Sequence, residues 1–353
     1  METPARQKPI THWVDLVRVV AMFLVVVIHV SGQLTNVWGQ IPTAQWIIAD
    51  IYGGIARVSV PLFFMISGFL LLPRSESLGS FYSRRIPKIA IPLVVWSLIY
   101  LAWFCGGHPG TCTPGLVQNL LLVQGTYYHL WFLYSLLGIY LVLPLLRLIV
   151  RPDTDRLLLW YFIGLWLVFQ PGWTMLQQFL HIYINIIALM ATNFLPYFFL
   201  GCLLGELTLS RRVIIVSTAL FVLGWLATSL GAYLMTRSSG QYNGFFYDFL
   251  SFNVIFASAG AFVLLRWAGE TAVLGSPRIH VFTRSLATTT FGIYLIHILV
   301  VEVIGYGIPF VHLNSFMGSA WWSIPLVCLI VFCISYLLVR GMQKIPVIQH
   351  IVP

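Results

Sequence analysis

The stretch DLVRVVAMFLVVVIHVSG, residues 15–32, decides the fold class, because it is apolar over nearly the length of a membrane-spanning helix. Three ionisable residues interrupt it, namely Asp15, Arg18 and His29. Arg18 and His29 are eleven residues apart, which places them within about 20° of the same helical face and about 16 Å apart along the axis. Asp15 precedes Arg18 by three residues, the spacing at which two helical side chains meet.

Ionisable groups are costly inside a span and by default mark a functional site. The alternative for this helix is that Arg18 extends to the lipid headgroups while His29 makes an interhelical hydrogen bond. Because both residues share one face, we favour the functional interpretation and treat Asp15, Arg18 and His29 as candidate catalytic residues.

The composition of the whole chain has the same character. Of its 353 residues, 59% are hydrophobic and only 8% are charged, against roughly 25% charged in soluble domains. A soluble globular enzyme is therefore excluded, and we expect one membrane-embedded domain over residues 1–353 with no appended soluble domain. The chain predicts an all-α polytopic bundle of about ten transmembrane helices. The expected spans are about 13–31, 47–72, 89–105, 129–150, 157–170, 186–206, 213–235, 249–267, 286–306 and 321–340.

The loop charges support this count. With ten spans and a cytoplasmic N-terminus, both termini are cytoplasmic, and every Lys and Arg except Arg18, Arg57 and Arg237 falls on a cytoplasmic segment. This distribution follows the positive-inside rule. The net charge of +9 therefore reports topology in a lipid bilayer, and no nucleic-acid partner is expected.

Cysteine usage indicates neither a disulfide scaffold nor a zinc site, so no metal is expected. Cys105 and Cys112 flank a short outward loop, where an oxidising compartment would permit a disulfide. The sequence leaves open whether these two cysteines are joined.

The second span contains ARVSVPLFFMISGFLLL, residues 56–72. A guanidinium at Arg57 needs a partner or a water-filled cavity inside a span, and Asp50 is the expected partner. Ser67 and Gly68 permit close helix approach, which ordinary small-residue packing also explains.

Arg84, Arg85 and Lys88 form a compact basic cluster in the connection that follows. Two explanations remain open for it: positive-inside anchoring, or a seat for the phosphates of a ligand.

Further polar residues lie at the fourth and ninth spans. His129 begins the fourth span, where Trp and Tyr are ordinary interface residues but histidine is not. Thr290, Tyr294 and His297 have the spacing i, i+4 and i+7 in the ninth span, which places them on one helical face. We expect that face to point into the bundle.

In this order, these strings resemble the integral-membrane acyltransferase-3 family, which transfers acyl groups onto cell-envelope sugars. The resemblance covers nearly the whole chain, and among subgroups it is strongest to short bacterial O-acetyltransferases of the enterobacterial common antigen type. It rests on the Arg18–His29 spacing and on RVSVPLFFMISGF (57–69), FYSRRIPKIAIP (81–92), YYHLWFLYSLLGIYLVLPLL (127–146) and TFGIYLIHILVV (290–301). One departure is WFLYSLLG (131–138), where many larger members have WSL followed by an acidic residue, so no acidic role is carried over there.

The resemblance implies a multi-pass protein of the bacterial inner membrane. It implies that acetyl-CoA is the cytoplasmic acyl donor and that the acceptor is a hydroxyl of an envelope glycan. Carried over by position, the family's motifs fall on Arg18 and His29, on Ser67 and Gly68, and on Arg84, Arg85 and Lys88.

We expect the basic cluster, with Ser67, to bind the donor while Arg18 supports it farther in. His29 is the expected general base, and an acetyl-histidine intermediate is the open alternative. The candidates for acceptor binding or for donating to the oxyanion are Arg57, His129, Tyr294 and His297.

Other functions stay open at this point. A transporter or flippase for a lipid-linked sugar would also suit many spans with intramembrane Arg and His, and a non-catalytic sensor is a further alternative. The sequence does not specify the sugar, the length of the acyl group or the oligomeric state, with a homo-oligomer among the alternatives.

Overall fold

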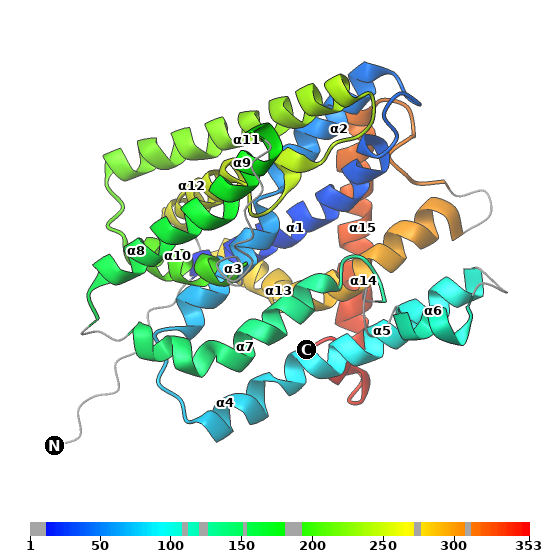
Figure 1. Cartoon of the computed structure of the whole chain (residues 1–353). Coiled ribbons are helices and arrows are strands. Elements are labelled where there is room, and N and C mark those ends of the chain that lie inside the picture. Colours follow the sequence, from blue (N-terminus) through cyan, green and yellow to red (C-terminus); the bar gives the residue numbers. More distant parts are fainter. Residues whose placement is uncertain are drawn as a thin grey trace.

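The computed structural model describes residues 12–107, 112–119, 126–150, 154–180, 193–271, 277–307 and 312–353. Within these ranges every regular element is a helix (Figure 1), which confirms the predicted all-α class. The α-helices are α1 (His12–Thr35), α2 (Thr43–Ala56), α3 (Ser59–Leu71), α4 (Leu78–Arg85), α5 (Pro87–Gly107), α6 (Pro114–Asn119), α7 (Trp131–Ile149), α8 (Arg156–Leu167), α9 (Trp173–Leu180), α10 (Leu195–Glu206), α11 (Arg211–Ser239), α12 (Phe252–Glu270), α13 (Pro277–Ala287), α14 (Thr290–Glu302) and α15 (Ala320–Met342).

Eight helical segments of the described part are long and apolar enough to cross a membrane. The pairs α2 with α3, α4 with α5, and α8 with α9 each count as one of them. Helices α13 and α14 form a ninth candidate that bends by 60°. Helix α10 is apolar but shorter, and the expected span 186–206 begins outside the described residues. The structure therefore confirms a polytopic bundle, while ten spans and cytoplasmic termini stay predictions.

Local sequence explains where several helices begin and end. Helix α5 begins at Pro87. The first N–H group of a helix has no partner within the helix, so a proline, which has no N–H group, is tolerated at this position. The side chains of Ser77, Asp155 and Ser210 accept hydrogen bonds from the first-turn N–H groups of α4, α8 and α11. Gly240 ends α11 with a φ of +72°, a conformation that glycine adopts without strain.

Helix α1 is the centre of the bundle. It contacts α2, α3, α12, α13, α14 and α15, and in Figure 1 it crosses the middle of the molecule between α11 above and α4 and α5 below. Val17, Ala21, Met22 and Val26 are fully buried along it. The helix that carries Asp15, Arg18 and His29 is therefore surrounded by other helices.

Helices α3 and α10 approach each other backbone to backbone. A Cβ added at Gly68 would lie 2.1 Å from the carbonyl oxygen of Phe198, and one added at Gly201 would lie 2.0 Å from that of Met65. Small residues are what permits such contact between spanning helices. Gly68 is thus a packing residue, which separates its role from that of the adjacent Ser67.

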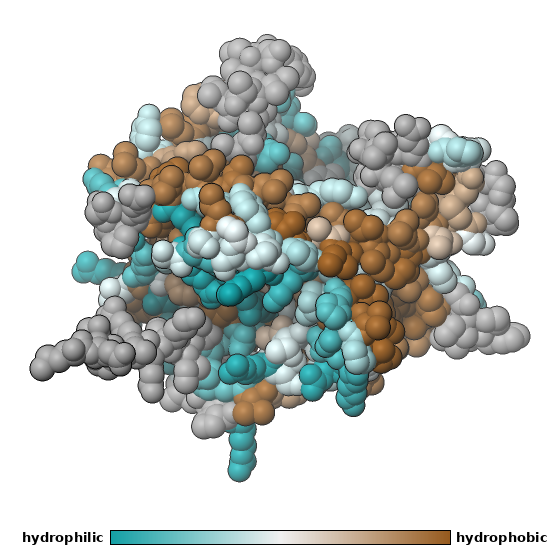
Figure 2. All heavy atoms as spheres, turned by 90° about the horizontal axis from the view of Figure 1, so that it is seen from below, coloured by the Kyte–Doolittle hydropathy of each residue, from teal (hydrophilic) through white to brown (hydrophobic). Residues whose placement is uncertain are grey.

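The outward faces of several helices are apolar. Leu223 and Leu230 on α11, and Val94 and Leu98 on α5, are more than half exposed. Figure 2 shows the molecule from below, with hydrophobic residues over a broad area at its right and hydrophilic residues gathered near its centre. Exposed apolar area of this extent suits contact with lipid.

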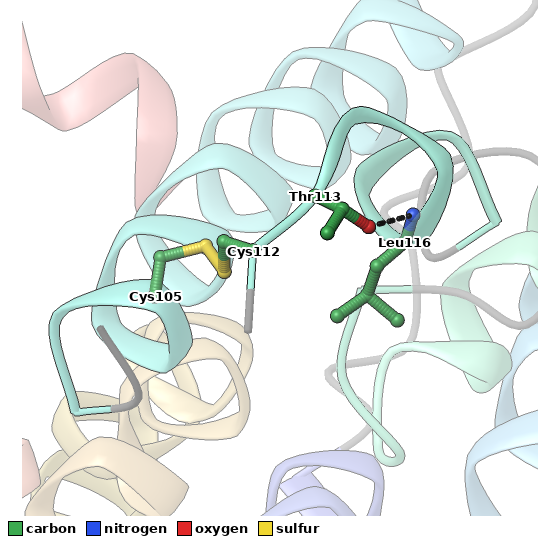
Figure 3. The surroundings of a disulfide bond; sticks show 4 residues. All are labelled: Cys105, Cys112, Thr113 and Leu116. Atoms are coloured by element: carbon green, nitrogen blue, oxygen red, sulfur yellow. Dashed lines mark hydrogen bonds between the residues drawn. A yellow bond between two sulfur atoms is a disulfide. The ribbon is translucent and has the colours of Figure 1, made fainter. Parts of the chain in front are cut away.

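A disulfide joins Cys105, near the end of α5, to Cys112, just before α6 (Figure 3), which decides the question that the sequence left open. The Cα atoms are 5.6 Å apart, an ordinary separation for a disulfide. Next to it, the hydroxyl of Thr113 accepts a 3.3 Å hydrogen bond from the N–H of Leu116 in α6.

Candidate active site

A cavity of about 500 Å³, here called the wide cavity, lies between α1, α3, α4, α5, α7, α13 and α14. Six residues singled out in the sequence line it: Arg18, Ser67, Arg85, Lys88, Thr290 and Tyr294. Arg84 is exposed and is not among the lining residues. The fold thus brings Arg18 together with two of the three residues of the basic cluster.

Arg18 is held at this cavity by its own helix. Its Nη1 lies 3.5 Å from Oδ1 of Asp15, the contact expected from the three-residue spacing. The Arg18 side chain is 37% exposed, so the guanidinium remains accessible to a ligand.

Glu76 connects two arginines beside the wide cavity. Its Oε2 lies 3.3 Å from Nη2 of Arg85 and 3.5 Å from Nη2 of Arg147, and Arg147 donates through Nε to the carbonyl of Leu71 at 3.0 Å. Desolvation raises the pKa of the Glu76 carboxyl, but attraction to Arg85 and Arg147 outweighs it, so the pKa lies below its ordinary value. The carboxylate therefore restrains Arg85 where that side chain lines the cavity.

A second cavity of about 130 Å³, the narrow cavity, is lined by His29, Arg57 and His129 among others. Phe63, Phe132 and Tyr294 line both cavities. The two spaces therefore meet at these three side chains, with Arg18 on one side of them and His29 on the other.

Three histidines gather beside the narrow cavity, and two of them, His29 and His129, line it. The ring centroid of His29 lies 5.1 Å from that of His297 and 6.5 Å from that of His129, and the last two are 5.4 Å apart. His29 is half-buried, whereas His129 and His297 are buried. Among the described residues no group of three His, Cys, Asp or Glu has a geometry that could hold a metal ion.

The proton of His297 can be assigned from its neighbours. Its Nδ1 lies 2.7 Å from the carbonyl oxygen of Tyr294 and 3.2 Å from that of Ile293. A carbonyl oxygen only accepts, so in the neutral ring the proton is on Nδ1 and Nε2 is an acceptor. Nε2 of His297 and both ring nitrogens of His129 are buried without a hydrogen-bond partner in the part of the chain that the structure describes.

Tyr294 also has its proton engaged, because its hydroxyl donates to the carbonyl oxygen of His129. Two of the oxyanion candidates, Tyr294 and His297, thus direct their N–H or O–H groups to backbone carbonyls. Arg57 lines this cavity, and its Nε is buried without a hydrogen-bond partner among the residues that the structure describes.

The expected pair between Arg57 and Asp50 does not form, and that prediction is wrong. Asp50 instead accepts the hydroxyl of Tyr247, which also reaches the Asp50 carbonyl oxygen at 3.3 Å. The guanidinium carbon of Arg57 lies over the Tyr247 ring, 4.3 Å from its centroid, and 5.5 Å from that of Phe249. A cation–π contact with Tyr247 replaces the ion pair.

Sequence reasoning missed Glu76 and Tyr247. Glu76 is the one acidic residue of the stretch 73–88, which also holds Arg74, Arg85 and Lys88. A single negative charge among basic residues was the signal that could have predicted its ion pairs. Tyr247 gave no such signal, since it is 190 positions from Arg57 and tyrosine is an ordinary residue in this composition.

The family model for the acyltransferase domain of the acyltransferase-3 family matches residues 11–340. Because this match covers most of the chain, the chain belongs to that family of membrane acyltransferases. The expectation from the quoted motifs is confirmed at this level. No solved structure matches the chain.

Curated relatives match over shorter stretches. Two amino-acid racemases of Enterococcus faecalis are 32% identical over 126 residues (34% of this chain and 16% of that protein) and 34% identical over 145 residues (38% and 19%). A serine/alanine racemase of Enterococcus gallinarum is 30% identical over 162 residues (44% and 22%). The chain therefore spans less than a quarter of the length of these relatives, and the similarity concerns a part of each.

The contacts of Glu76 predict the effect of its removal. Glu76→Gln leaves Arg85 and Arg147 without a counter-charge, so we expect a lower unfolding temperature for the purified protein in detergent. Glu270→Gln is the matched control, because Glu270 pairs with Arg266 within one helix and is 41% exposed, a kind of pair that contributes little. Equal unfolding temperatures for the two variants would show that the ion pairs of Glu76 with Arg85 and Arg147 do not stabilise the fold.

Proposed function

We propose that this chain is an O-acetyltransferase of the bacterial inner membrane that moves an acetyl group from cytoplasmic acetyl-CoA to a hydroxyl of a cell-envelope sugar. The carrying observation is the meeting of the two cavities at Phe63, Phe132 and Tyr294. One cavity has the cations that a polyphosphate donor needs, and the other has an imidazole. Their contact offers a place where an acyl group entering from one side meets a hydroxyl on the other.

The donor side of the proposal rests on charge and space. Arg85 and Lys88 line the wide cavity and supply charged N–H donors for the phosphates of acetyl-CoA. Arg18, on the central helix α1, adds a third positive charge to the lining of the wide cavity, and we assign it to support of the donor farther in. Ser67 lies on the same wall, but its hydroxyl donates to the carbonyl of Phe63 at 2.8 Å, so it offers a ligand only its oxygen as an acceptor.

His29 is the proposed general base. It takes the proton from the acceptor hydroxyl as the oxygen bonds to the thioester carbonyl carbon. The carbon–sulfur bond then breaks, and the protonated imidazole returns the proton to the departing sulfur, so that CoA leaves as the thiol. A positioned imidazole typically contributes about 10²–10⁴-fold to such a step. In the covalent alternative, a ring nitrogen of His29 carries the acetyl group between donor and acceptor.

Family membership and the wide cavity favour this function over the flippase alternative. A flippase moves its lipid-linked sugar without consuming an acyl donor. It therefore has no need of the basic residues of the wide cavity beside the histidines of the narrow cavity. The racemase activity in the names of the relatives is not proposed for this chain, because less than a quarter of each of those proteins is matched.

The proposal predicts that His29→Ala abolishes transfer of label from acetyl-CoA to envelope glycan, measured with the purified protein in liposomes, while protein abundance stays normal. His312→Ala is the matched control, since His312 is exposed outside both cavities. Wild-type activity of His29→Ala would remove His29 from the chemistry. Movement of glycan across the bilayer without acetylation by the wild-type protein would instead support a flippase.

A second prediction separates the basic residues. Lys88→Glu should raise the apparent KM for acetyl-CoA by about tenfold or more, since a charged hydrogen bond to phosphate is replaced by repulsion. Arg84→Glu, which alters an exposed side chain outside the wide cavity, should change the same KM far less. A KM for acetyl-CoA that stays at the wild-type value in both variants would leave both residues as determinants of topology only.

A further inference from the structure

The guanidinium of Arg57 forms no ion pair with any carboxylate of the described residues, although Asp50 and Asp248 lie near enough to attract it. In the ranges that the structure describes, the side chain makes no ion pair and its Nε is both buried and without a hydrogen bond. A buried charge without a partner is costly. An Arg in this state at a cavity wall is suited to receive an anion from a ligand.

Two carboxylates, Asp50 and Asp248, lie near enough to attract Arg57, and both already accept hydrogen bonds from other groups. Asp50 is 2% exposed, and its carboxylate accepts the hydroxyl of Tyr247. Its backbone carbonyl accepts from Ser229 at 3.2 Å as well. Tyr247 therefore contacts both groups, because its hydroxyl donates to the Asp50 carboxylate while its ring lies against the guanidinium of Arg57.

The guanidinium of Arg57 makes cation–π contacts with two aromatic rings. Tyr247 lies 4.3 Å from the guanidinium carbon and Phe249 lies 5.5 Å from it, measured to the ring centroids. These ring contacts use none of the N–H groups of the guanidinium as hydrogen-bond donors to oxygen. A guanidinium can donate two parallel N–H groups to two oxygens of a carboxylate or a phosphate.

The location of Arg57 indicates which of the two substrates carries the anion. Arg57 lines the narrow cavity with Tyr128, Trp131 and Phe249, and it does not line the wide cavity. Apolar and aromatic walls with a few polar groups are typical of small-molecule sites. A donor that enters from the wide cavity reaches Phe63, Phe132 and Tyr294 first, so an anion at Arg57 belongs to the other substrate.

We propose that Arg57 binds a carboxylate or phosphate carried by the acceptor, so that the sugar unit acetylated by this protein is anionic. This inference rests on the proposed function and adds the substrate class to it. His29, which lines the same cavity, then faces a hydroxyl of a unit whose charge is fixed at Arg57.

Competition in membrane vesicles tests this specificity. Transfer of label from acetyl-CoA to the native glycan is measured with methyl glucuronoside, glucose 1-phosphate and methyl glucoside as competitors. At least one anionic probe should inhibit at a concentration about tenfold lower than the neutral glucoside, as a charged hydrogen bond is worth about 1.5–3 kcal/mol. Inhibition by the glucuronoside alone identifies an acidic sugar, and inhibition by the sugar phosphate alone identifies a phosphate.

Three variants make the test specific. Arg57→Gln should remove the preference for the anionic probe and raise the acceptor KM, while Arg57→Lys, which keeps the charge, should retain part of both. Arg237→Gln is the matched control, because Arg237 is exposed at the end of α11, outside both cavities. A pure oxyanion role would instead lower kcat at unchanged acceptor KM, and that result would overturn the inference.

Two further outcomes also decide it. Equal inhibition by neutral and anionic probes in the wild-type protein, or a neutral acetylated unit in the mass spectrum of the glycan, would overturn the anionic acceptor while leaving acetyl transfer in place. Absence of any transfer from acetyl-CoA by the wild-type protein would instead contradict the proposed function itself.

Discussion

The cost of keeping an ionisable group in an apolar bundle is the constraint on which this structure depends. A charge or imidazole that is surrounded by hydrocarbon needs a partner, a cavity or another compensating contact. Helix α1, which contacts six other helices, carries Arg18 and His29 on one face. The bundle meets the constraint by placing a cavity at each of them, and Asp15 gives Arg18 a partner as well.

The same constraint explains why the two cavities are different. The wide cavity has several cations at its wall, with Glu76 as a counter-charge for Arg85. The narrow cavity is mostly aromatic, and its histidines and Arg57 hold few internal hydrogen bonds. Polar groups that the protein leaves unpaired in an enclosed space are available to a substrate, and exclusion of water strengthens their electrostatic effect on it.

Much of this arrangement could be predicted from the sequence, because it depends on helical periodicity and composition. The all-α membrane class followed from the scarcity of charge, and the eleven-residue spacing of Arg18 and His29 fixed their common face. Choice of partner depends on tertiary contacts, which periodicity does not report. Asp50 was the nearest acidic residue to Arg57 in the chain, yet Tyr247 engages both. Arg84 and Arg85 are adjacent, but about 100° of rotation per residue directs them differently, and only Arg85 lines the wide cavity.

The central claim is that donor and acceptor meet at the partition formed by Phe63, Phe132 and Tyr294. An experimental structure of the protein with a non-hydrolysable analogue of acetyl-CoA tests this most directly. The account predicts density for the phosphates beside Arg85 and Lys88, with the acyl end at the partition and facing His29. Density for the analogue outside the wide cavity, or an acyl end directed away from the partition, would contradict it.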